Sequence, residues 1–173
     1  MEHIYKYFKE LNKLNTIIRT GWLNRNVPLE RLESVGEHIF TMALLSLATI
    51  DKYELNLNIE KVLKMILIHE LGEIDVGDIA LPTGNQIIEK YEGELKGVKR
   101  ICSVLDESWM LDLWLEFEEK KTEEAAFVYK MDKLQAVMQS RYYSELTGNP
   151  KLFDEFYKNA IPKCGEFLEI SKK

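Results

Sequence analysis

Two of the three histidines in the sequence lie at the edges of strongly apolar segments, where polar side chains are otherwise scarce. His38 stands in SVGEHIFTMALL and His69 in KVLKMILIHELGE. A single histidine on an apolar helix face is more often an ordinary core residue than a metal ligand. The pair is more informative because acidic residues crowd the segment that follows the second histidine. These are Glu70, Glu73, Asp75 and Asp78.

The acidic residues fall where the helix that carries His69 should end. The C-terminal end of a helix already carries the negative half of the macrodipole, so further carboxylates there are unfavourable without a cation. A bound metal ion would supply that cation, and imidazole with carboxylate suits Mn, Fe, Co, Ni or Zn. Such a site could polarise a phosphoryl oxygen and lower the pKa of a bound water.

A further acid, Asp132, interrupts the largely apolar stripe of FVYKMDKLQAVM. Carboxylates are rarely buried unless they are paired or bound to a metal. One interpretation is an exposed aspartate that pairs with Lys130 or Lys133. The other places Asp132 with His38, His69 and Glu70 around one metal ion.

The segment His69-Glu70-Leu71-Gly72-Glu73 also begins like the HExxH helix of zinc proteases. That motif needs two imidazoles one helical turn apart on the same face. Here Glu73 occupies the second histidine position, and Gly72 weakens the helix that the motif requires. The sequence therefore argues against a zinc protease.

The elements that must position these residues are helical, because apolar residues recur every three or four positions along almost the whole chain. Helices are expected over 4–18, from 34, over 59–71, from 83, over 109–117, over 122–146 and from 149. Ser34 and Glu37 have the spacing of a capping box, which fixes the start of the second helix. Alternating strand patterns, repeats and internal linkers are missing. We predict one all-α domain over residues 1–173, a bundle of about six or seven helices.

Composition and charge exclude some classes of function. The chain has 173 residues and a net charge of -6, which argues against a binder of duplex nucleic acid, although a single phosphate could still be held locally. No apolar run approaches the about 18 residues of a membrane span, and the first residues lack the apolar stretch of a signal peptide. Cys102 and Cys164 form no short-spaced framework and suit a reducing compartment. We expect a cytoplasmic protein without a membrane partner.

Three segments in this order resemble the HD-domain hydrolases, in particular the branch of bacterial 5′-deoxynucleotidases and their small eukaryotic relatives. They are ESVGEHIFTMALL, MILIHELGEIDVGDI and TEEAAFVYKMDKLQAVMQSRYY. The similarity runs from Arg19 to about Tyr143 and includes Trp114, Glu116 and Thr122. One such segment would be a weak signal, but three at this spacing are specific.

The resemblance implies an all-α HD domain that holds one divalent metal ion, which could be Mn, Co, Fe, Ni, Zn or Mg. The ligands that it implies are His38, His69, Glu70 and Asp132. The family has an aspartate where this chain has Glu70. One extra methylene moves the carboxylate by roughly 1.5 Å, whereas metal–ligand distances tolerate only about ±0.2 Å. Three outcomes stay open: Glu70 binds the metal, the other three ligands hold it weakly, or the domain binds no metal.

The resemblance also implies two catalytic residues and two substrate-binding residues. Glu73 would organise or activate the attacking water, and Asp78 would contact the nucleotide sugar or assist proton transfer. Arg19 and Trp22 would shape the pocket for phosphate and sugar, and the planar guanidinium suits bidentate phosphate contacts. A surface ion pair for Arg19 and a core position for Trp22 remain alternatives.

We therefore predict a metal-dependent phosphohydrolase of small nucleotides, with 2′-deoxyribonucleoside 5′-monophosphates as expected substrates. One alternative is a nucleoside triphosphate triphosphohydrolase, and another is a catalytically weak nucleotide-binding module. A homodimer is also expected from the family. Aromatic residues near the C-terminus offer apolar surface for it, although an ordinary core position is the favoured interpretation for them: Phe153, Phe156, Tyr157 and Phe167.

Overall fold

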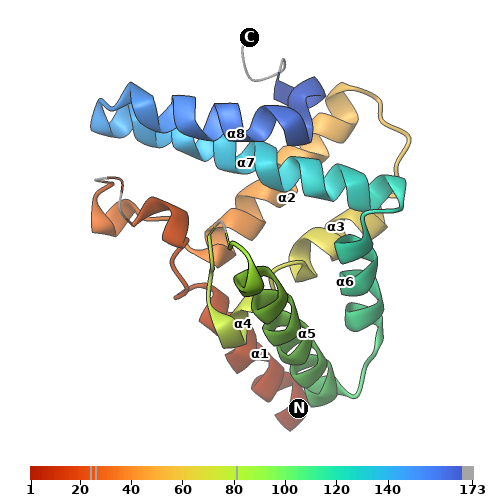
Figure 1. The fold of residues 1–173 in the computed structure, drawn as a ribbon. Helices are drawn as coiled ribbons and strands as arrows, with labels where there is room; N and C mark the ends of the chain where they lie inside the picture. Colours follow the sequence, from red (N-terminus) through yellow and green to blue (C-terminus); the bar gives the residue numbers. More distant parts are fainter. Residues whose placement is uncertain (24, 26, 81, 169–173) are drawn as a thin grey trace.

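The computed structural model describes residues 1–23, 25, 27–80 and 82–168, and helices make up nearly all of its regular structure (Figure 1). The longer helices are α1 (Glu2–Leu14), α2 (Val35–Lys52), α3 (Ile59–Ile68), α5 (Asn85–Leu105), α6 (Trp109–Glu119), α7 (Glu123–Thr147) and α8 (Pro150–Leu168). α4 (Glu73–Val76) is a single turn, and 3-10 turns cover Thr20–Trp22 and Leu29–Arg31. Within the described residues there is no strand beyond one isolated bridge between Ile18 and Ser34. The predicted all-α fold is confirmed.

Local capping signals set several helix starts as predicted. Ser34 caps α2 in a complete capping box, in which its hydroxyl accepts from the backbone N–H of Glu37 and the Glu37 carboxylate accepts from the Ser34 backbone. Thr122 caps α7 by accepting from the backbone N–H of Ala125. These caps matter for function because α2 and α7 each carry one candidate metal ligand.

Two helices end earlier than their apolar spacing predicts. α1 stops at Leu14 rather than Ile18, and the chain then pairs with the segment before α2 through the bridge at Ile18. α3 stops at Ile68 with His69 as its C-cap, whereas the apolar pattern extends to Leu71. Beyond His69 the backbone continues in tighter i to i+3 turns, such as that between Ile68 and Leu71. The end of α3 is therefore irregular where the acidic residues begin.

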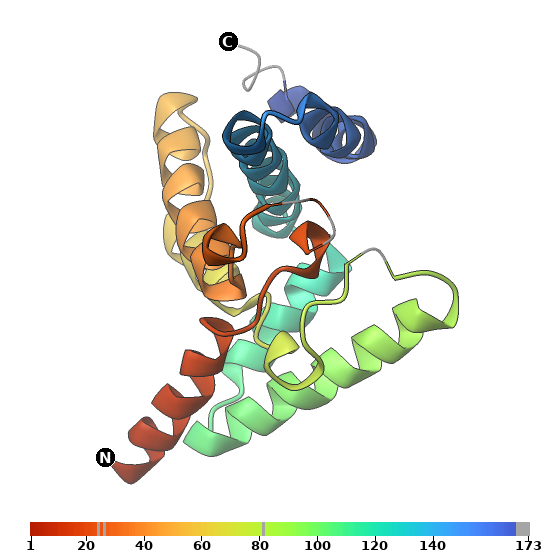
Figure 2. The same ribbon diagram turned by 90° about the vertical axis from the view of Figure 1, so that its left-hand side faces the viewer.

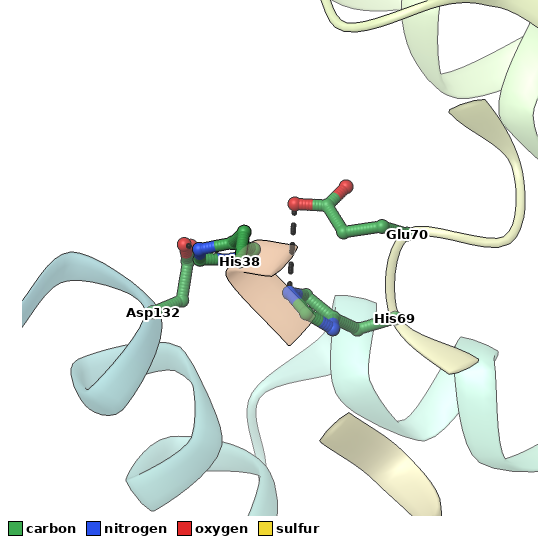
Figure 3. Close-up of side chains that lie close together, drawn as sticks. All are labelled: His38, His69, Glu70 and Asp132. Carbon is green, nitrogen blue, oxygen red and sulfur yellow. Dashed lines mark ion pairs between the residues drawn. The ribbon is translucent and has the colours of Figure 1, made fainter. Parts of the chain in front are cut away.

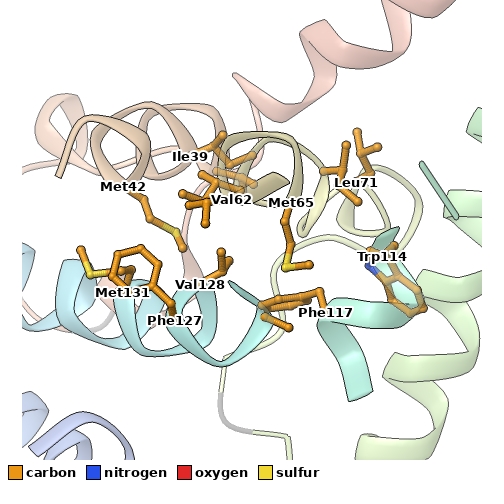
Figure 4. Packing of buried hydrophobic residues seen from close by; sticks show 14 of the residues in the cluster. Ile39, Met42, Val62, Met65, Leu71, Trp114, Phe117, Phe127, Val128 and Met131 are labelled. Atoms are coloured by element: carbon orange, nitrogen blue, oxygen red, sulfur yellow. The ribbon is translucent and has the colours of Figure 1, made fainter. Parts of the chain in front are cut away.

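The long helix α7 lies at the centre of the packing, against α2, α3, α6 and α8 (Figures 1 and 2). Side chains from α2, α3, α6 and α7 interdigitate in the main core, among them Met42, Met65, Phe117 and Met131 (Figure 4). Each fully buried side chain of this size contributes roughly 1.5–3 kcal/mol of hydrophobic stabilisation. This core holds α2, α3 and α7 in register and so fixes the backbone positions from which the site side chains project.

Because Gly72, Gly93 and Gly97 have no side chain, α5 packs closely against the α4 turn and the residues just before it. A Cβ on Gly72 would lie 2.5 Å from the Glu94 Cβ, and one on Gly93 would lie 2.6 Å from a Val76 methyl. A Cβ on Gly97 would lie 3.0 Å from the Gly72 carbonyl oxygen. Gly72 lies two residues after Glu70, so this close contact places α5 beside the site.

No helix in the part of the chain that the structure describes combines the length and apolarity that crossing a membrane requires.

The close approach predicts that Gly72→Ala lowers stability. The added methyl must displace Glu94 or the α4 turn, which costs about 1–3 kcal/mol for overpacking. Urea unfolding followed by circular dichroism measures the difference. Gly165→Ala is the control, because a Cβ there meets no atom within 4 Å, and its midpoint should be unchanged or slightly higher. Equal midpoints for the two variants would contradict this account of the α4–α5 contact.

Candidate metal centre

The side chains of the four candidate ligands converge on one point inside the helical bundle (Figure 3). His38 projects from α2, His69 and Glu70 from the end of α3, and Asp132 from α7. Each offers one ligand atom, and these atoms all lie within 4.8 Å of one another. Residues separated by as many as 94 positions in the sequence thus meet in a geometry that one ion could bridge.

A hydrogen-bond network fixes the orientation of His38. Its Nδ1 lies 2.7 Å from the Gln135 side-chain oxygen Oε1. The Gln135 amide nitrogen donates to the Glu33 carboxylate and to the Thr41 hydroxyl, so the amide oxygen must face the imidazole. Because that oxygen can only accept, Nδ1 carries the proton and Nε2 presents its lone pair to the centre in the neutral ring.

His69 is oriented in the same way by the backbone. Its Nδ1 lies 2.7 Å from the Ile66 carbonyl oxygen, which can only accept a hydrogen bond. Complete burial lowers the pKa of His69 and keeps the ring neutral. A neutral imidazole whose Nδ1 donates to a carbonyl is the usual second-sphere arrangement of a metal-binding histidine.

Both Nε2 atoms face carboxylate oxygens without forming a hydrogen bond to them. They are buried and have no hydrogen-bond partner among the described residues. The Nε2 of His38 lies 3.4 Å from the Asp132 Oδ1, and the Nε2 of His69 lies 3.5 Å from the Glu70 Oε1. Lone pairs that face one another in a buried space repel unless a cation lies between them. The donor set therefore fits a divalent metal ion with two imidazole and two carboxylate ligands.

Asp132 combines features of both interpretations that the sequence left open. The residue is buried, at 6% exposure, and not on the surface. It nevertheless pairs with Lys133, whose ammonium lies 2.6 Å from Oδ2 while Oδ1 faces the two imidazoles. Burial opposes ionisation of this carboxyl, but Lys133, His38 and Arg19 outweigh that effect and hold its pKa well below the usual range. Asp132 is thus a charged carboxylate with one oxygen free for an ion.

Glu70 reaches the centre despite its longer side chain. Its Oε1 lies 3.3 Å from the Arg19 Nη1 and belongs to the same group of atoms as the two imidazoles. Burial disfavours the charged form, yet the neighbouring His69 and Arg19 bring the pKa of Glu70 down to about 2. Since burial keeps the His69 ring neutral, Arg19 is the lasting positive charge beside this carboxylate.

Arg19 lies inside the site and not on the surface. Its guanidinium is within 4 Å of the carboxylates of Glu70, Asp78 and Asp132, and only 14% of the side chain is exposed. Burial alone would lower the pKa of Arg19, but these three carboxylates raise it above its usual value. A permanently charged guanidinium therefore stands between the candidate ligands and the pocket.

Glu73 is an almost completely buried acid at the start of α4. Burial raises the pKa of Glu73 to about 10, and the charges of Glu70 and Asp78 act in the same direction. Its Oε1 lies 3.3 Å from the Lys90 ammonium, while Oε2 is buried without a hydrogen-bond partner among the described residues. In this state the side chain holds a proton at neutral pH and has one oxygen available to a bound molecule.

Asp78 anchors the segment that carries Arg19. Its Oδ2 accepts hydrogen bonds from the backbone N–H of Thr20 at 2.5 Å and from the Thr20 hydroxyl at 2.6 Å. The other oxygen, Oδ1, lies 3.7 Å from the Arg19 guanidinium. Asp75, which the sequence placed in the same acidic cluster, points away and pairs with Arg100 on α5.

Trp22 is almost fully buried and lines the pocket. Only 2% of it is exposed, its ring stacks on Phe156 at a centroid distance of 4.4 Å, and its indole N–H donates to Glu33. The same Glu33 carboxylate holds Gln135 and, through it, His38. Trp22 is therefore linked to His38 through Glu33 and Gln135, and this chain of hydrogen bonds joins the pocket wall to a candidate ligand.

A pocket of about 320 Å³ opens beside the cluster. Glu70, Glu73, Asp78 and Asp132 line its inner end together with Arg19. Apolar residues and further cations line the remainder: Ile79, Ala80, Pro82, Val137, Phe156, Arg25, Lys90, Lys133 and Lys163. Pockets of this size bind small molecules, and the mixture of apolar wall and positive charge suits an organic anion.

Sequence reasoning missed several residues that support the site. Gln135 lies three positions after Asp132, so helical spacing alone places both on one face of α7. Thr20 follows Arg19 directly, but its bond to Asp78 joins segments 58 residues apart. Lys90 on α5 contacts Glu73, and nothing in the sequence pattern signals that contact.

Comparisons with known proteins agree with this geometry. The HD domain family matches residues 11–168. The 5′-deoxynucleotidase HDDC2 of Mus musculus is 31% identical over 163 residues, which is 92% of this chain and 79% of the relative. The protein of the same name from Dictyostelium discoideum is 35% identical over 154 residues, covering 84% and 80% of the two chains.

Solved structures show the same fold. A conserved hypothetical protein from Pyrococcus furiosus superposes with a TM-score of 0.74 at 31% identity, covering 94% of this chain and 90% of that one. An HD-domain phosphohydrolase from Listeria innocua gives a TM-score of 0.73 at 23% identity, covering 96% and 82%. At that identity the second likeness supports the fold alone.

The position of Arg19 predicts that Arg19→Met destabilises the metal-free protein. Removing the guanidinium leaves Glu70 and Asp132 as buried charges with less compensation, and breaking a buried ion pair costs up to about 3–5 kcal/mol. Thermal and urea unfolding in EDTA measure the loss.

Arg25→Met is the matched control, because the partner of Arg25, Glu155, is half exposed and such a pair is worth at most about 1 kcal/mol. The account of Arg19 as the internal counter-ion is wrong if both variants lose the same small amount.

Proposed function

Because the chain belongs to the HD domain family, we propose that it is a metal-dependent phosphohydrolase that releases phosphate from 2′-deoxyribonucleoside 5′-monophosphates. The supporting observation is the pair of buried imidazoles whose unpartnered Nε2 atoms face two carboxylates beside a pocket. The relatives named 5′-deoxynucleotidase support the substrate class. The alternative of a metal-free module fits this arrangement poorly.

We propose that His38, His69, Glu70 and Asp132 hold one divalent metal ion, whose identity is open among Mn, Co, Fe, Ni, Zn and Mg. When bound, the ion supplies Lewis acidity toward phosphoryl oxygens and toward water. The protein fixes both imidazoles through Gln135 and the Ile66 carbonyl, so little reorganisation accompanies binding.

Arg19 is the proposed phosphate-binding residue. Its fork of N–H donors lines the pocket next to Glu70 and Asp132, where a phosphate would meet both the guanidinium and the metal site. Charge that develops on the phosphoryl oxygens in the transition state is stabilised by such preorganised donors. The apolar wall beyond, with Ile79, Pro82 and Val137, is the proposed surface for the nucleoside.

Glu73 and Asp78 are the proposed catalytic residues. The free Oε2 of Glu73 would orient the attacking water, and the carboxylate form of Glu73 would accept a proton from it. Thr20 holds Asp78 so that Oδ1 alone is free toward the pocket, where it would contact the sugar or the departing 5′ oxygen. Trp22 lines the pocket and stacks on Phe156, and it would thereby shape the sugar side of the pocket.

A single HD domain over 1–173, a homodimer and a cytoplasmic location remain proposals. Phe153, Phe156 and Tyr157 are half-buried in the structure, and the side chain of Phe167 lies outside the described residues. Phe156 is stacked on Trp22 and so serves the pocket wall. Sedimentation equilibrium would determine the oligomeric state.

We expect the purified protein to release inorganic phosphate from deoxynucleoside monophosphates when Mn²⁺ or Co²⁺ is added, and His38→Ala to abolish that activity. Losing one imidazole removes a ligand and leaves Asp132 without its neighbour, so both metal content and turnover should fall. A malachite green assay over a nucleotide panel measures the product. Release of tripolyphosphate from triphosphates would instead identify a triphosphohydrolase, and no release with any metal would refute both enzymes.

Substitutions at Glu70 test whether its carboxylate binds the metal. Glu70→Gln keeps the shape but removes the charge, and we expect a loss of metal affinity of about 10-fold or more. Glu70→Asp should retain metal binding, because the helix end can adjust to a carboxylate. Isothermal titration with Mn²⁺ on EDTA-treated protein gives the affinities. Unchanged affinity in Glu70→Gln would mean that only the other three residues hold the ion.

A further inference from the structure

A second group of carboxylates lies directly beside the candidate metal centre. It consists of Glu70, Glu73 and Glu94, whose ligand oxygens all lie within 4.8 Å of one another. Glu70 belongs to both groups. Glu73 is 1% exposed, and 12% of the Glu94 side chain is exposed. Acids this close in a buried space need a cation among them or must take up protons.

The ammonium of Lys90 lies among these carboxylates. It is 3.3 Å from the Glu73 Oε1, 3.2 Å from the Glu94 Oε1 and 3.4 Å from the Ile79 carbonyl oxygen. The ammonium donates hydrogen bonds to the Glu73 and Ile79 oxygens, whereas the Glu94 oxygen is an ion-pair contact without a hydrogen bond. The carboxylates of Glu70, Glu94 and Glu73 raise the pKa of Lys90, against the effect of burial. Lys90 is thus a charged and well-held cation inside the protein.

The backbone packing of α5 fixes this arrangement. Lys90 and Glu94 are one turn apart on α5, and the close approach at Gly72 brings the Glu94 backbone against the end of the candidate ligand segment. A larger residue at Gly72 or Gly93 would push α5 away from α4. The lysine is therefore placed by the fold and not by a flexible surface contact.

The group still has an oxygen without a partner. The Oε2 of Glu73 is buried and makes no hydrogen bond with any described residue, although the side chain is almost fully enclosed. Burying an acceptor in that way is costly. This free oxygen and the carboxylate of the shared Glu70 are ligands that a second divalent ion could use. In the structure the ammonium of Lys90 lies beside them in place of such an ion.

We propose that Lys90 is a fixed second cation of this centre: its ammonium fills a cation position formed by Glu70, Glu73 and Glu94, keeps a second metal ion out and positions Glu73. The proposal rests on the proposed function, since the first metal is the one assigned to the two histidines. The ammonium already contacts Glu73 and Glu94, and a divalent ion bound by the same carboxylates would lie close to it and be strongly repelled in this buried site. The centre therefore holds one metal while Lys90 is present.

Lys90→Met tests this directly, because methionine keeps much of the apolar stem and removes the charge. After reconstitution with Mn²⁺ and desalting, elemental analysis should give one metal per chain in the parent and two in the variant. Lys90→Arg keeps the charge and should stay at one. Lys99→Met is the control on the exposed face of α5 and should also stay at one.

A double variant separates a true second site from a general effect of charge. Adding Glu94→Gln to Lys90→Met removes one proposed ligand and should return the content to one metal. Circular dichroism and thermal unfolding establish that each variant is folded, and Lys90→Gln replaces Lys90→Met if the latter is not. One metal in a folded, charge-free variant, or two in the parent, overturns the proposal.

The proposed function can fail separately. If the parent binds one metal and releases phosphate, and the Lys90 variant also binds one metal, only the proposed role of Lys90 is refuted. A parent that binds no metal overturns both proposals.

Discussion

Carboxylates that are buried close together need positive charge nearby. This requirement determines which side chains surround the candidate metal centre. Glu70 and Asp132 are held ionised in a nearly closed space, while burial keeps the adjacent imidazole of His69 neutral. Arg19 and Lys133 supply fixed cations at the edge of the cluster, but neither lies between the two Nε2 atoms and the carboxylates. The donor set is therefore incomplete without an ion, which is why it fits a metal centre better than an ordinary core.

The same requirement links the site to the packing of the helices. The glycines at 72, 93 and 97 remove the side chains that would keep α5 away from α4, and the resulting contact places Lys90 and Glu94 beside Glu73. Glycine in a helix interior lowers helix stability, so Gly93 and Gly97 weaken α5 locally while they allow the close approach. The charges around Glu73 thus depend on how closely α5 packs against α4.

Replacement of aspartate by glutamate at position 70 is accommodated by the end of α3. His69 is the C-cap, and the tighter turns that follow let the longer carboxylate reach the same point as the two imidazoles. Glu70 also approaches Glu73 and Glu94 closely enough to belong to a second acidic group. A glutamate here consequently couples the candidate metal centre to the Lys90 cluster.

The sequence by itself determined the helical fold, the capped start of α2, and the candidates His38, His69, Glu70 and Asp132. These follow from apolar periodicity, short-range capping and the rarity of histidine and acid in apolar stretches, which are local properties of the chain. Only the tertiary structure decided that Asp132 is buried and also paired, that Trp22 is buried against Phe156 in the pocket wall, and that Gln135 orients His38. It alone brought Lys90 to Glu73, since contacts between distant segments depend on how helices pack, and no spacing along the chain encodes them.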